Sequence, residues 1–375
     1  MRHYRPTHLY VEESVSRSPI TRNVLERLPQ LAVEVIATTE SLLKESREYN
    51  PTIPRAKQSL VLARHKGRFF KPCPGGQARG NARNVCCNYF VINYAANCHM
   101  ECSYCYLQSY LNFPYLIIHA NLDDLLGELA ETLAPHPGKF FRIGTGELAD
   151  SLALDPLTGY SVPLVEFFSS RKNAVLEFKT KSDCVDRLLD LDHRGRTVVS
   201  WSMNPPGLQA QEEHKTATIE ERLVAAQRCV QAGYPVAFHF DPLIFHPGWR
   251  ENYQALVNEI FDRIPAASIS WMSLGALRLT PGLKAMMRER FSSSSLPLAE
   301  LVPSPDGKLR YVKPIRVEMY NRVLNWIRAR KSPHTAVYAC MERPEVWSRV
   351  FRHSCPTDEE VGDRLGAALV SLDPS

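Results

Sequence analysis

Apolar residues between about residues 88 and 290 occur in short runs that alternate with helical patterns. Six runs rich in Val, Ile and aromatic residues predict strands at residues 88–94, 139–144, 174–180, 197–203, 235–241 and 268–275. Strands that alternate with helices are typical of βα units around a parallel sheet. We therefore predict an α/β protein with a partial (β/α)6 barrel, an incomplete TIM-like barrel with N-terminal and C-terminal extensions.

Two helices between these strands have clear sequence signals. Leucines recur at helical spacing over residues 122–133, and Asn121 precedes them as a candidate N-cap. The other helix opens with Thr218 and Glu221, the spacing of a capping box, and stops at Gly233, which suits a left-handed C-terminal position. Outside the barrel, the pattern predicts helices at about residues 29–45 and 316–330 and a strand at residues 335–340.

The predicted barrel divides the chain into three parts. Residues 1–87 form an N-terminal segment with a basic tract rich in Gly and Cys, residues 88–295 form the barrel, and residues 296–375 form a C-terminal α/β extension. In parallel barrels the loops that follow the strands build the active site. Functional side chains are therefore expected just beyond the C-terminal end of each strand.

The composition limits the class of protein. Lys and Arg number 45 against 40 Asp and Glu, a net charge of +5 that permits DNA binding without indicating it. No apolar run approaches the roughly 20 residues that cross a bilayer, and the first residues lack the apolar stretch of a secretory signal. We therefore expect a cytoplasmic protein that binds no membrane. In that compartment, the 10 cysteines favour metal binding or catalysis over disulfides.

Three cysteines follow the first predicted strand directly. Cys98, Cys102 and Cys105 have the Cys-x-x-x-Cys-x-x-Cys spacing of radical S-adenosylmethionine (SAM) enzymes. Three thiolates on one short loop can hold three irons of a 4Fe-4S cluster and leave the fourth iron open for SAM, the source of a 5′-deoxyadenosyl radical in such enzymes. The alternative is a structural zinc site, which would need His99 or a distant residue as its fourth ligand.

The sequence around these cysteines resembles the spore photoproduct lyase family. The resemblance is carried by residues 98–108, 118–125, 180–181, 185–190, 202–204 and 232–249, which follow one another in family order. It implies a partial (β/α)6 barrel that binds SAM and acts on a thymine-derived lesion in DNA as a carbon-carbon lyase. In that family the radical abstracts hydrogen from the lesion, the linkage between two thymines breaks, and a cysteine returns a hydrogen atom with tyrosines nearby.

The same resemblance assigns roles to individual residues. Lys181 and Ser202 fall on family positions that contact SAM, and Asn204 belongs to the same matching segment as Ser202, so all three are expected to bind this cofactor. Tyr104 and Tyr106 fall on the catalytic tyrosines that flank the third cluster cysteine. The alternative for both tyrosines is packing, since aromatic residues are common in protein cores.

The chain departs from the family in the loop after the second predicted strand. The family places its hydrogen-donating cysteine there, whereas residues 144–151 read Gly-Thr-Gly-Glu-Leu-Ala-Asp-Ser and put Glu147 at the donor position. Gly-Thr-Gly-Glu resembles the Gly-Gly-Glu element of many radical SAM enzymes, in which the carboxylate holds the ammonium group of SAM. Glu147 is therefore a candidate cofactor ligand. Alternatively, Glu147 and Asp150 cap the helical segment that follows.

Other cysteines have no assigned role. Cys184 follows the third predicted strand and could face the barrel mouth, whereas Cys229 lies on the inward face of a helix and is expected to be a core residue. Cys73, Cys86 and Cys87 flank the basic Gly-rich tract. They could form a redox-active or hydrogen-donating set, a second metal site or a group of buried thiols.

Three hypotheses for the function remain open from the sequence. The first is a radical SAM lyase that acts on DNA and receives electrons from a reductant such as flavodoxin or ferredoxin. The second is a radical SAM enzyme that acts on a peptide or metabolite, and the third is an iron-sulfur or zinc protein that only binds partners. The presence of Lys181 and Ser202 together with the three loop cysteines argues against the third.

Overall fold

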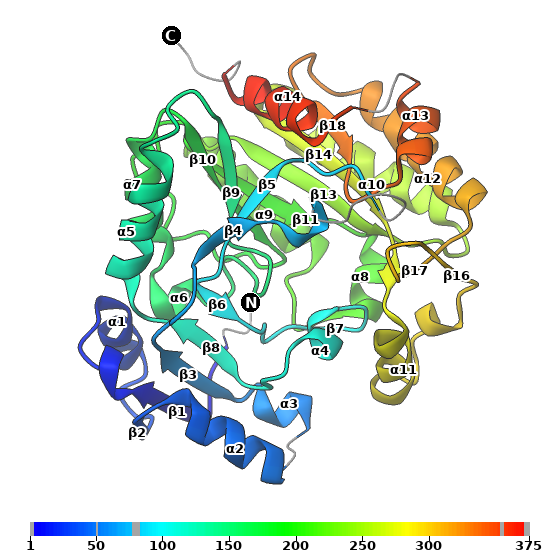
Figure 1. Ribbon diagram of the computed structural model, residues 1–375. Helices are drawn as coiled ribbons and strands as arrows, with labels where there is room; N and C mark the ends of the chain where they lie inside the picture. Colours follow the sequence, from blue (N-terminus) through cyan, green and yellow to red (C-terminus); the bar gives the residue numbers. More distant parts are fainter. Residues whose placement is uncertain (1–3, 50–51, 77–82, 353–355, 371–375) are drawn as a thin grey trace.

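Eight strands form one curled sheet in the computed structural model, which describes residues 4–49, 52–76, 83–352 and 356–370 (Figure 1). From one edge to the other the strands are β18 (Ala336–Ala339), β14 (Ile269–Ala276), β13 (Val236–Leu243), β11 (Thr197–Ser202), β10 (Ala174–Thr180), β9 (Phe141–Gly144), β5 (Tyr89–Ile92) and β4 (Phe70–Pro72). Neighbours from β18 to β5 pair in parallel, and β4 pairs antiparallel to β5.

All six predicted strands are present, which confirms the partial barrel. Every residue of β11 and β14 is buried, as expected for parallel strands that are covered on both faces. Strands from outside the central segment, β4 and β18, extend the sheet at its two edges. Near the open side between these edges, the N–H of Val85 donates to the carbonyl of Glu342 at 2.8 Å.

Helices lie around this sheet and beside the N-terminal strands (Figure 1). They are α1 (Pro19–Arg27), α2 (Thr39–Tyr49), α3 (Ile53–Ala56), α4 (Leu107–Tyr110), α5 (Leu122–Leu133), α6 (Asp155–Thr158), α7 (Ser161–Ser169), α8 (Pro206–Glu212), α9 (Ile219–Gln231), α10 (Trp249–Arg263), α11 (Pro281–Arg290), α12 (Lys313–Arg328), α13 (Pro344–Phe351) and α14 (Asp358–Val370). Two predicted helix signals are confirmed: Thr218 and Glu221 form the capping box of α9, and Gly233 follows it with a φ of 85°.

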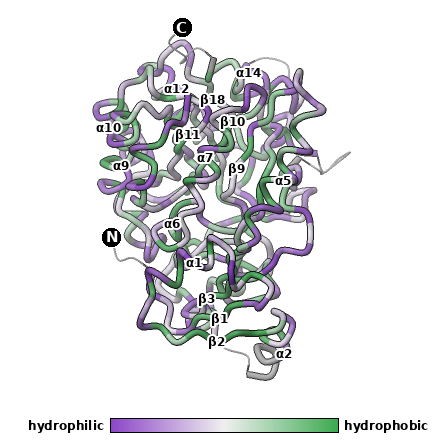
Figure 2. The backbone as a smooth tube through the Cα atoms, turned by 90° about the vertical axis from the view of Figure 1, so that its left-hand side faces the viewer, coloured by the Kyte–Doolittle hydropathy of each residue, from purple (hydrophilic) through white to green (hydrophobic). Residues whose placement is uncertain are grey.

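A second sheet of five strands lies below the barrel in Figure 2. Its strands, in spatial order, are β2 (Val33–Ile36), β1 (His8–Glu12), β3 (Ser59–Ala63), β8 (Leu116–His119) and β6 (Ala95–Ala96). The last two strands flank the three-cysteine loop in the sequence and pair with each other. The N-terminal sheet therefore holds both ends of that loop.

Two local predictions for the N-terminal half are wrong. The helix expected at residues 29–45 is interrupted, because residues 33–36 form β2, whose β-branched side chains favour a strand next to β1. Asn121 stands at the N-cap of α5, but its side chain makes no capping bond. It bonds instead to the backbone N–H and carbonyl of His65, which ties α5 to the N-terminal sheet.

The C-terminal residues complete the barrel and add a small sheet. The predicted helix at residues 316–330 is α12, and the predicted strand at residues 335–340 is β18. Three short strands pair antiparallel beyond the end of β14: β15 (Arg278–Leu279), β17 (Leu309–Arg310) and β16 (Val302–Pro303). Among the described residues, no helix has the length and apolar character to cross a membrane.

Candidate active site

The three-cysteine loop follows β5 and β6, at the end of the barrel where parallel barrels place their active sites. Within the loop, β7 (Glu101–Cys102) pairs antiparallel with β12 (Glu213–His214), a strand that follows β11 and α8. The N–H of Ser103 donates to the carbonyl of Glu212 at 2.8 Å. The loop is thus bound to the barrel on one side and to the N-terminal sheet on the other.

A buried and a partly buried cation hold the middle of the loop. Lys57, directly after α3, donates from Nζ to the carbonyl of Met100 at 2.8 Å, and the same Nζ lies 3.3 Å from a carboxylate oxygen of Glu101. Arg290, at the end of α11, pairs with the other carboxylate oxygen of Glu101 at 2.6 Å. The backbone between the first two cysteines is therefore fixed by segments that are far apart in the sequence.

The three cysteine side chains pack in one small apolar cluster. Burial raises the pKa of Cys98 to about 12 and raises the pKa of Cys102 well above its ordinary value, although the nearby Lys181 opposes the second shift. In the absence of metal, both groups are therefore neutral thiols at pH 7. Because iron binds the thiolate form, cluster binding at this loop must release protons.

The loop suits a cluster better than a single metal ion. In the parts of the chain that the structure describes, no three His, Cys, Asp or Glu side chains are arranged to hold one metal ion. Each cysteine of an iron-sulfur cubane binds a different iron, so the sulfurs stand farther apart than the ligands of one zinc ion. His99, the nearest candidate for a fourth zinc ligand, packs its ring against Tyr4 at a centroid distance of 5.2 Å.

Lys181 and Tyr104 meet beside the loop. Nζ of Lys181 lies 5.7 Å from the centre of the Tyr104 ring, and the Tyr104 hydroxyl donates to the carboxylate of Glu213. Burial alone would lower the pKa of Lys181, but the negative charge of the nearby Glu213 opposes burial, and the pKa is raised. A charged ammonium group therefore lies next to Cys102, where the carboxylate of a cofactor could bind.

Glu213 and Arg222 form a fully buried ion pair behind Lys181. Their charged groups are 2.6 Å apart, and Arg222 also donates to the backbone carbonyl of Ser202 at 2.7 Å. Burial would raise the pKa of Glu213, but Arg222 and Lys181 outweigh it and lower the pKa to about 2. The carboxylate of Glu213 therefore stays ionised close to Lys181. Arg222 fixes the end of β11 through its bond to the Ser202 carbonyl.

Asn204 belongs to the same buried network. Its amide donates to Glu213 at 2.8 Å and to the Tyr104 hydroxyl at 3.3 Å, and its carbonyl accepts from the Tyr253 hydroxyl at 2.8 Å. Both hydrogens of the Asn204 amide are therefore used within the protein. These contacts give Asn204 a positioning role, and its contact with a cofactor stays a prediction.

The loop after β9 begins at Gly144, where the backbone lies close to the side chain of Tyr89. A Cβ atom on Gly144 would lie 1.5 Å from the Tyr89 hydroxyl, so this position requires glycine. Asp150 fixes the far end of the loop, because its carboxylate accepts from the N–H groups of Lys181 at 2.7 Å and Ala153 at 2.9 Å. Asp150 therefore caps the segment that follows it, which is the capping alternative given above for Glu147 and Asp150.

Glu147 lies in the middle of this loop and has a different environment. Its carboxylate is 3.3 Å from Nζ of Lys71 on β4, and its backbone carbonyl accepts from the Tyr106 hydroxyl at 2.5 Å. Tyr106 is 41% exposed and directly follows Cys105. The structure thus brings Glu147 and Tyr106 together next to the last cysteine of the loop, with a carboxylate and a phenol at the barrel mouth.

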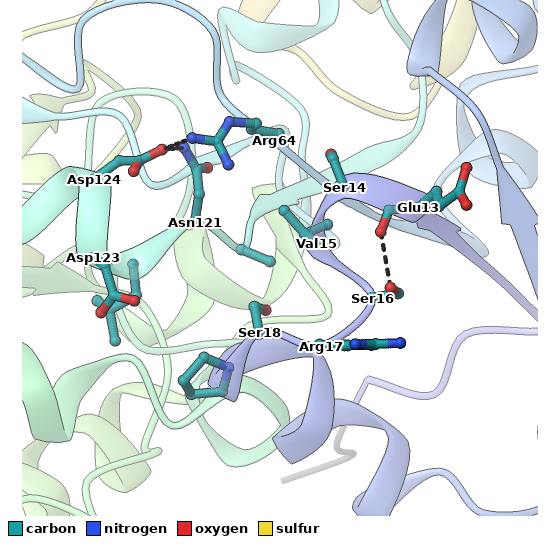
Figure 3. Close-up of a pocket in the computed structure, with 13 residues that line it drawn as sticks. Glu13, Ser14, Val15, Ser16, Arg17, Ser18, Arg64, Asn121, Asp123 and Asp124 are labelled. Atoms are coloured by element: carbon teal, nitrogen blue, oxygen red, sulfur yellow. Dashed lines mark hydrogen bonds and ion pairs between the residues drawn. The ribbon is translucent and has the colours of Figure 1, made fainter.

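A cavity of about 460 Å³ lies elsewhere, between η1 (Glu13–Val15), α1 and the start of α5. Figure 3 shows that Arg64 pairs with Asp124 at one side of it, and that Glu13 and Asp123 bring further negative charge. None of the predicted site residues lines it. We therefore assign the active site to the cysteine loop and not to this cavity.

The fold and the loop define a class of protein. A partial parallel barrel with a Cys-x-x-x-Cys-x-x-Cys loop after its first parallel strand is the arrangement of radical SAM enzymes. Within that class, the family model described as "Spore photoproduct lyase" matches residues 4–304, and the chain belongs to the spore photoproduct lyase family. Members of this family are radical SAM lyases that use a 4Fe-4S cluster and SAM, so the expected cofactors and enzyme class are confirmed.

Individual relatives agree with this family. Spore photoproduct lyase of Geobacillus sp. (strain Y412MC61) is 26% identical over 307 residues, which are 80% of this chain and 86% of that protein. A solved spore photoproduct lyase complexed with dinucleoside spore photoproduct has a TM-score of 0.77 and 23% identity over 90% of this chain and 100% of its own. A solved double mutant of a spore photoproduct lyase with bound AdoMet and dinucleoside spore photoproduct has a TM-score of 0.75 and 22% identity, with 90% and 99% coverage.

Sequence reasoning missed the residues that hold the loop in place. Lys57, Glu101 and Arg290 are ordinary charged residues at distant positions, and only the fold brings them together. Glu213 and Arg222 were also missed, although they are only nine residues apart. Arg222 on the inward face of a predicted helix was a signal, because arginine is rarely fully buried unless it is paired.

Replacement of Lys57 by methionine is expected to lower the reduction potential of the cluster. A buried cation next to the loop favours the more negative, reduced state of an iron-sulfur centre, so its loss makes reduction harder. The potential is measured by redox titration of reconstituted protein with electron paramagnetic resonance. Lys66→Met, which removes an exposed lysine paired with Glu40, is the matched control. An unchanged potential in Lys57→Met would contradict this electrostatic role.

Proposed function

We propose that this protein is a radical SAM lyase that repairs spore photoproduct, a thymine lesion in DNA. The observation that carries the proposal is the meeting of the three-cysteine loop, Lys181 and Glu147 at one end of a partial barrel. Membership of the spore photoproduct lyase family supports the reaction, and the relative solved with dinucleoside spore photoproduct supports the substrate.

Different residues of the site bind the cluster and SAM. Cys98, Cys102 and Cys105 hold the 4Fe-4S cluster, which with SAM supplies the 5′-deoxyadenosyl radical. Lys181 attracts the carboxylate of SAM, and Glu147 accepts hydrogen bonds from its ammonium group. These two groups of opposite charge follow neighbouring strands, β10 and β9, so they lie at the same end of the barrel.

The remaining predicted residues position these groups. The ion pair of Glu213 and Arg222 keeps Lys181 charged and fixes the Ser202 backbone, from which the Ser202 hydroxyl can reach SAM. Tyr104 links Glu213 to the loop, and Tyr106 lies at the entrance, where it can exclude water from the radical. In this proposal the electron comes from a flavodoxin or ferredoxin in the cytoplasm.

The experiment compares three substrates under anaerobic conditions. Reconstituted, reduced protein is incubated with SAM and with dinucleoside spore photoproduct, a cyclobutane thymine dimer or undamaged dithymidine, and both 5′-deoxyadenosine and restored thymine are measured by chromatography. Restored thymine from spore photoproduct alone is the expected result. Formation of 5′-deoxyadenosine without restored thymine would contradict the proposed substrate and favour a peptide or metabolite.

Replacement of Glu147 by glutamine is expected to weaken SAM binding by about 10- to 100-fold. The change removes a charge-assisted hydrogen bond to the ammonium group, worth about 1.5–3 kcal/mol, while it preserves the size of the side chain. The dissociation constant is measured by titration of the reconstituted protein with SAM. Glu166→Gln on the exposed face of α7 is the control. Equal affinities in the two variants would restrict Glu147 to its contact with Lys71.

A further inference from the structure

Four cysteines outside the cluster loop line one cavity at the open side of the barrel. The cavity has a volume of about 170 Å³, and Cys73, Cys86, Cys87 and Cys340 lie on its wall. They come from three segments: the end of β4, the segment before β5 and the residue after β18. Cys73 continues the β4–β5 ladder, since its N–H donates to the carbonyl of Tyr89 at 2.8 Å. These thiols are therefore placed by the sheet itself.

Cys73 is the cavity cysteine that faces the candidate active site. Lys71 and Cys73 are two residues apart on an extended strand, so their side chains lie on the same face. The Lys71 ammonium is 3.3 Å from the carboxylate of Glu147, which places Cys73 beside the same loop. Tyr106 lies beside this loop as well, since its hydroxyl donates to the backbone carbonyl of Glu147 at 2.5 Å.

The chemical state of Cys73 suits a hydrogen-atom donor. A thiol can give a hydrogen atom because its S–H bond is weak, whereas a thiolate has none to give. Burial raises the pKa of Cys73 and the negative charge of Glu147 adds to this shift, while a hydrogen bond with the backbone of Gly75 and the charge of Lys179 oppose it; the net shift is upward, so the group is a thiol at pH 7. Cys86 and Cys87 are buried, whereas Cys73 and Cys340 are half-buried, and of these two Cys73 follows the strand whose Lys71 contacts the Glu147 loop.

We propose that Cys73, at the end of β4, gives a hydrogen atom to the thymine radical. It would replace the family's donor cysteine, whose position in the loop after β9 is taken by Glu147, a carboxylate that cannot give a hydrogen atom. This inference rests on the proposed function. In the step, the S–H bond of Cys73 breaks homolytically and a C–H bond forms at the methylene radical of the thymine released from the lesion. The unpaired electron stays on Sγ of Cys73. One electron from the ferredoxin or flavodoxin reductant and one proton from water then restore the thiol, so each turnover consumes two electrons and one SAM.

The test follows the transferred atom. Thiols exchange their hydrogen with solvent whereas the carbon-bound hydrogens of the substrate do not, so repair by the holoenzyme in D2O should place one deuterium in the methyl group of each restored thymine. Cys73→Ala should still form 5′-deoxyadenosine and consume dinucleoside spore photoproduct, but should restore at least tenfold less thymine. Cys73→Ser, which keeps a polar group of similar size, should behave in the same way, and Cys229→Ala in the core of α9 should match the wild type.

Each outcome decides one question. Wild-type protein that restores no thymine contradicts the proposed function, and the donor role with it. Wild-type repair with equal thymine yield and deuterium content in Cys73→Ala contradicts the donor role alone. Iron or zinc bound in addition to the four irons of the loop cluster, and lost in Cys73→Ala, would also overturn the inference, because it would assign these cysteines to a second metal site.

Discussion

Cys98→Ala, Cys102→Ala and Cys105→Ala proteins are each expected to lack the 4Fe-4S cluster and to form no detectable 5′-deoxyadenosine. Each thiolate holds a different iron, and the loop contains no fourth cysteine that could replace a lost ligand. Iron content should fall from about four atoms per chain to near zero after anaerobic reconstitution. Iron analysis, absorption spectra and chromatography of 5′-deoxyadenosine measure these effects.

The control for the cluster variants is Cys184→Ala, a buried cysteine after β10. It should retain both iron and SAM cleavage, since it lies outside the cysteine cluster of the loop. Circular dichroism should give the same secondary structure for all four variants, because alanine tolerates the loop conformation. Normal iron content in any of the three loop variants would contradict the assignment of that cysteine as a ligand.

Glu213→Ala is expected to reduce the free energy of unfolding by about 3–5 kcal/mol. The change leaves Arg222 charged in a fully buried position without its partner at 2.6 Å, and it removes the acceptor of the Tyr104 hydroxyl. It also removes the negative charge that raises the pKa of Lys181, so SAM cleavage should fall as well. Denaturant unfolding of the metal-free protein measures the stability.

The matched control is Glu220→Ala. Glu220 lies on α9, the helix that carries Arg222, and pairs at the surface with Arg263 of α10. Exposed ion pairs contribute little because water screens them, so this variant should unfold close to the wild type. Equal stabilities of Glu213→Ala and Glu220→Ala would contradict the role given to the buried pair.

The carboxylate of Glu213 also makes the stability of the protein depend on pH. The pKa of Glu213 in the folded protein is about 2, below its ordinary value of 4.5. The ionised group therefore stabilises the fold above pH 4.5, and this contribution is lost as the pH falls from 4.5 towards 2. The loss of stability over that interval should be smaller in Glu213→Gln than in the wild type.

The barrel could be predicted from the sequence because its signals are local. Each of the six strands is an apolar, β-branched run, and the capping box of α9 and Gly233 behind it are neighbours in the chain. The segment at residues 29–45 failed because the pairing of Val33–Ile36 with β1 decides its structure, and that partner is about 25 residues away in the sequence. The spacing of apolar residues within a short segment contains no information about a strand that pairs with it from elsewhere in the chain.

In the site, too, local features could be predicted from the sequence, and contacts between distant residues could not. The spacing of Cys98, Cys102 and Cys105 identifies the loop because the three ligands lie within one short segment. Lys57 and Arg290 reach the loop from positions more than 40 and 180 residues away, so no sequence window contains them with the cysteines. Cys73 and Cys340 are likewise brought to one cavity only by the two edges of the sheet.

The most direct test of the account follows hydrogen from the lesion into the cofactor. Reconstituted protein is given SAM and dinucleoside spore photoproduct that is deuterated on the thymine ring carbons, and the 5′-deoxyadenosine formed is analysed by mass spectrometry. The account predicts that 5′-deoxyadenosine contains deuterium and that thymine is restored in the same reaction. Unlabelled 5′-deoxyadenosine, formed while the lesion remains intact, would contradict it.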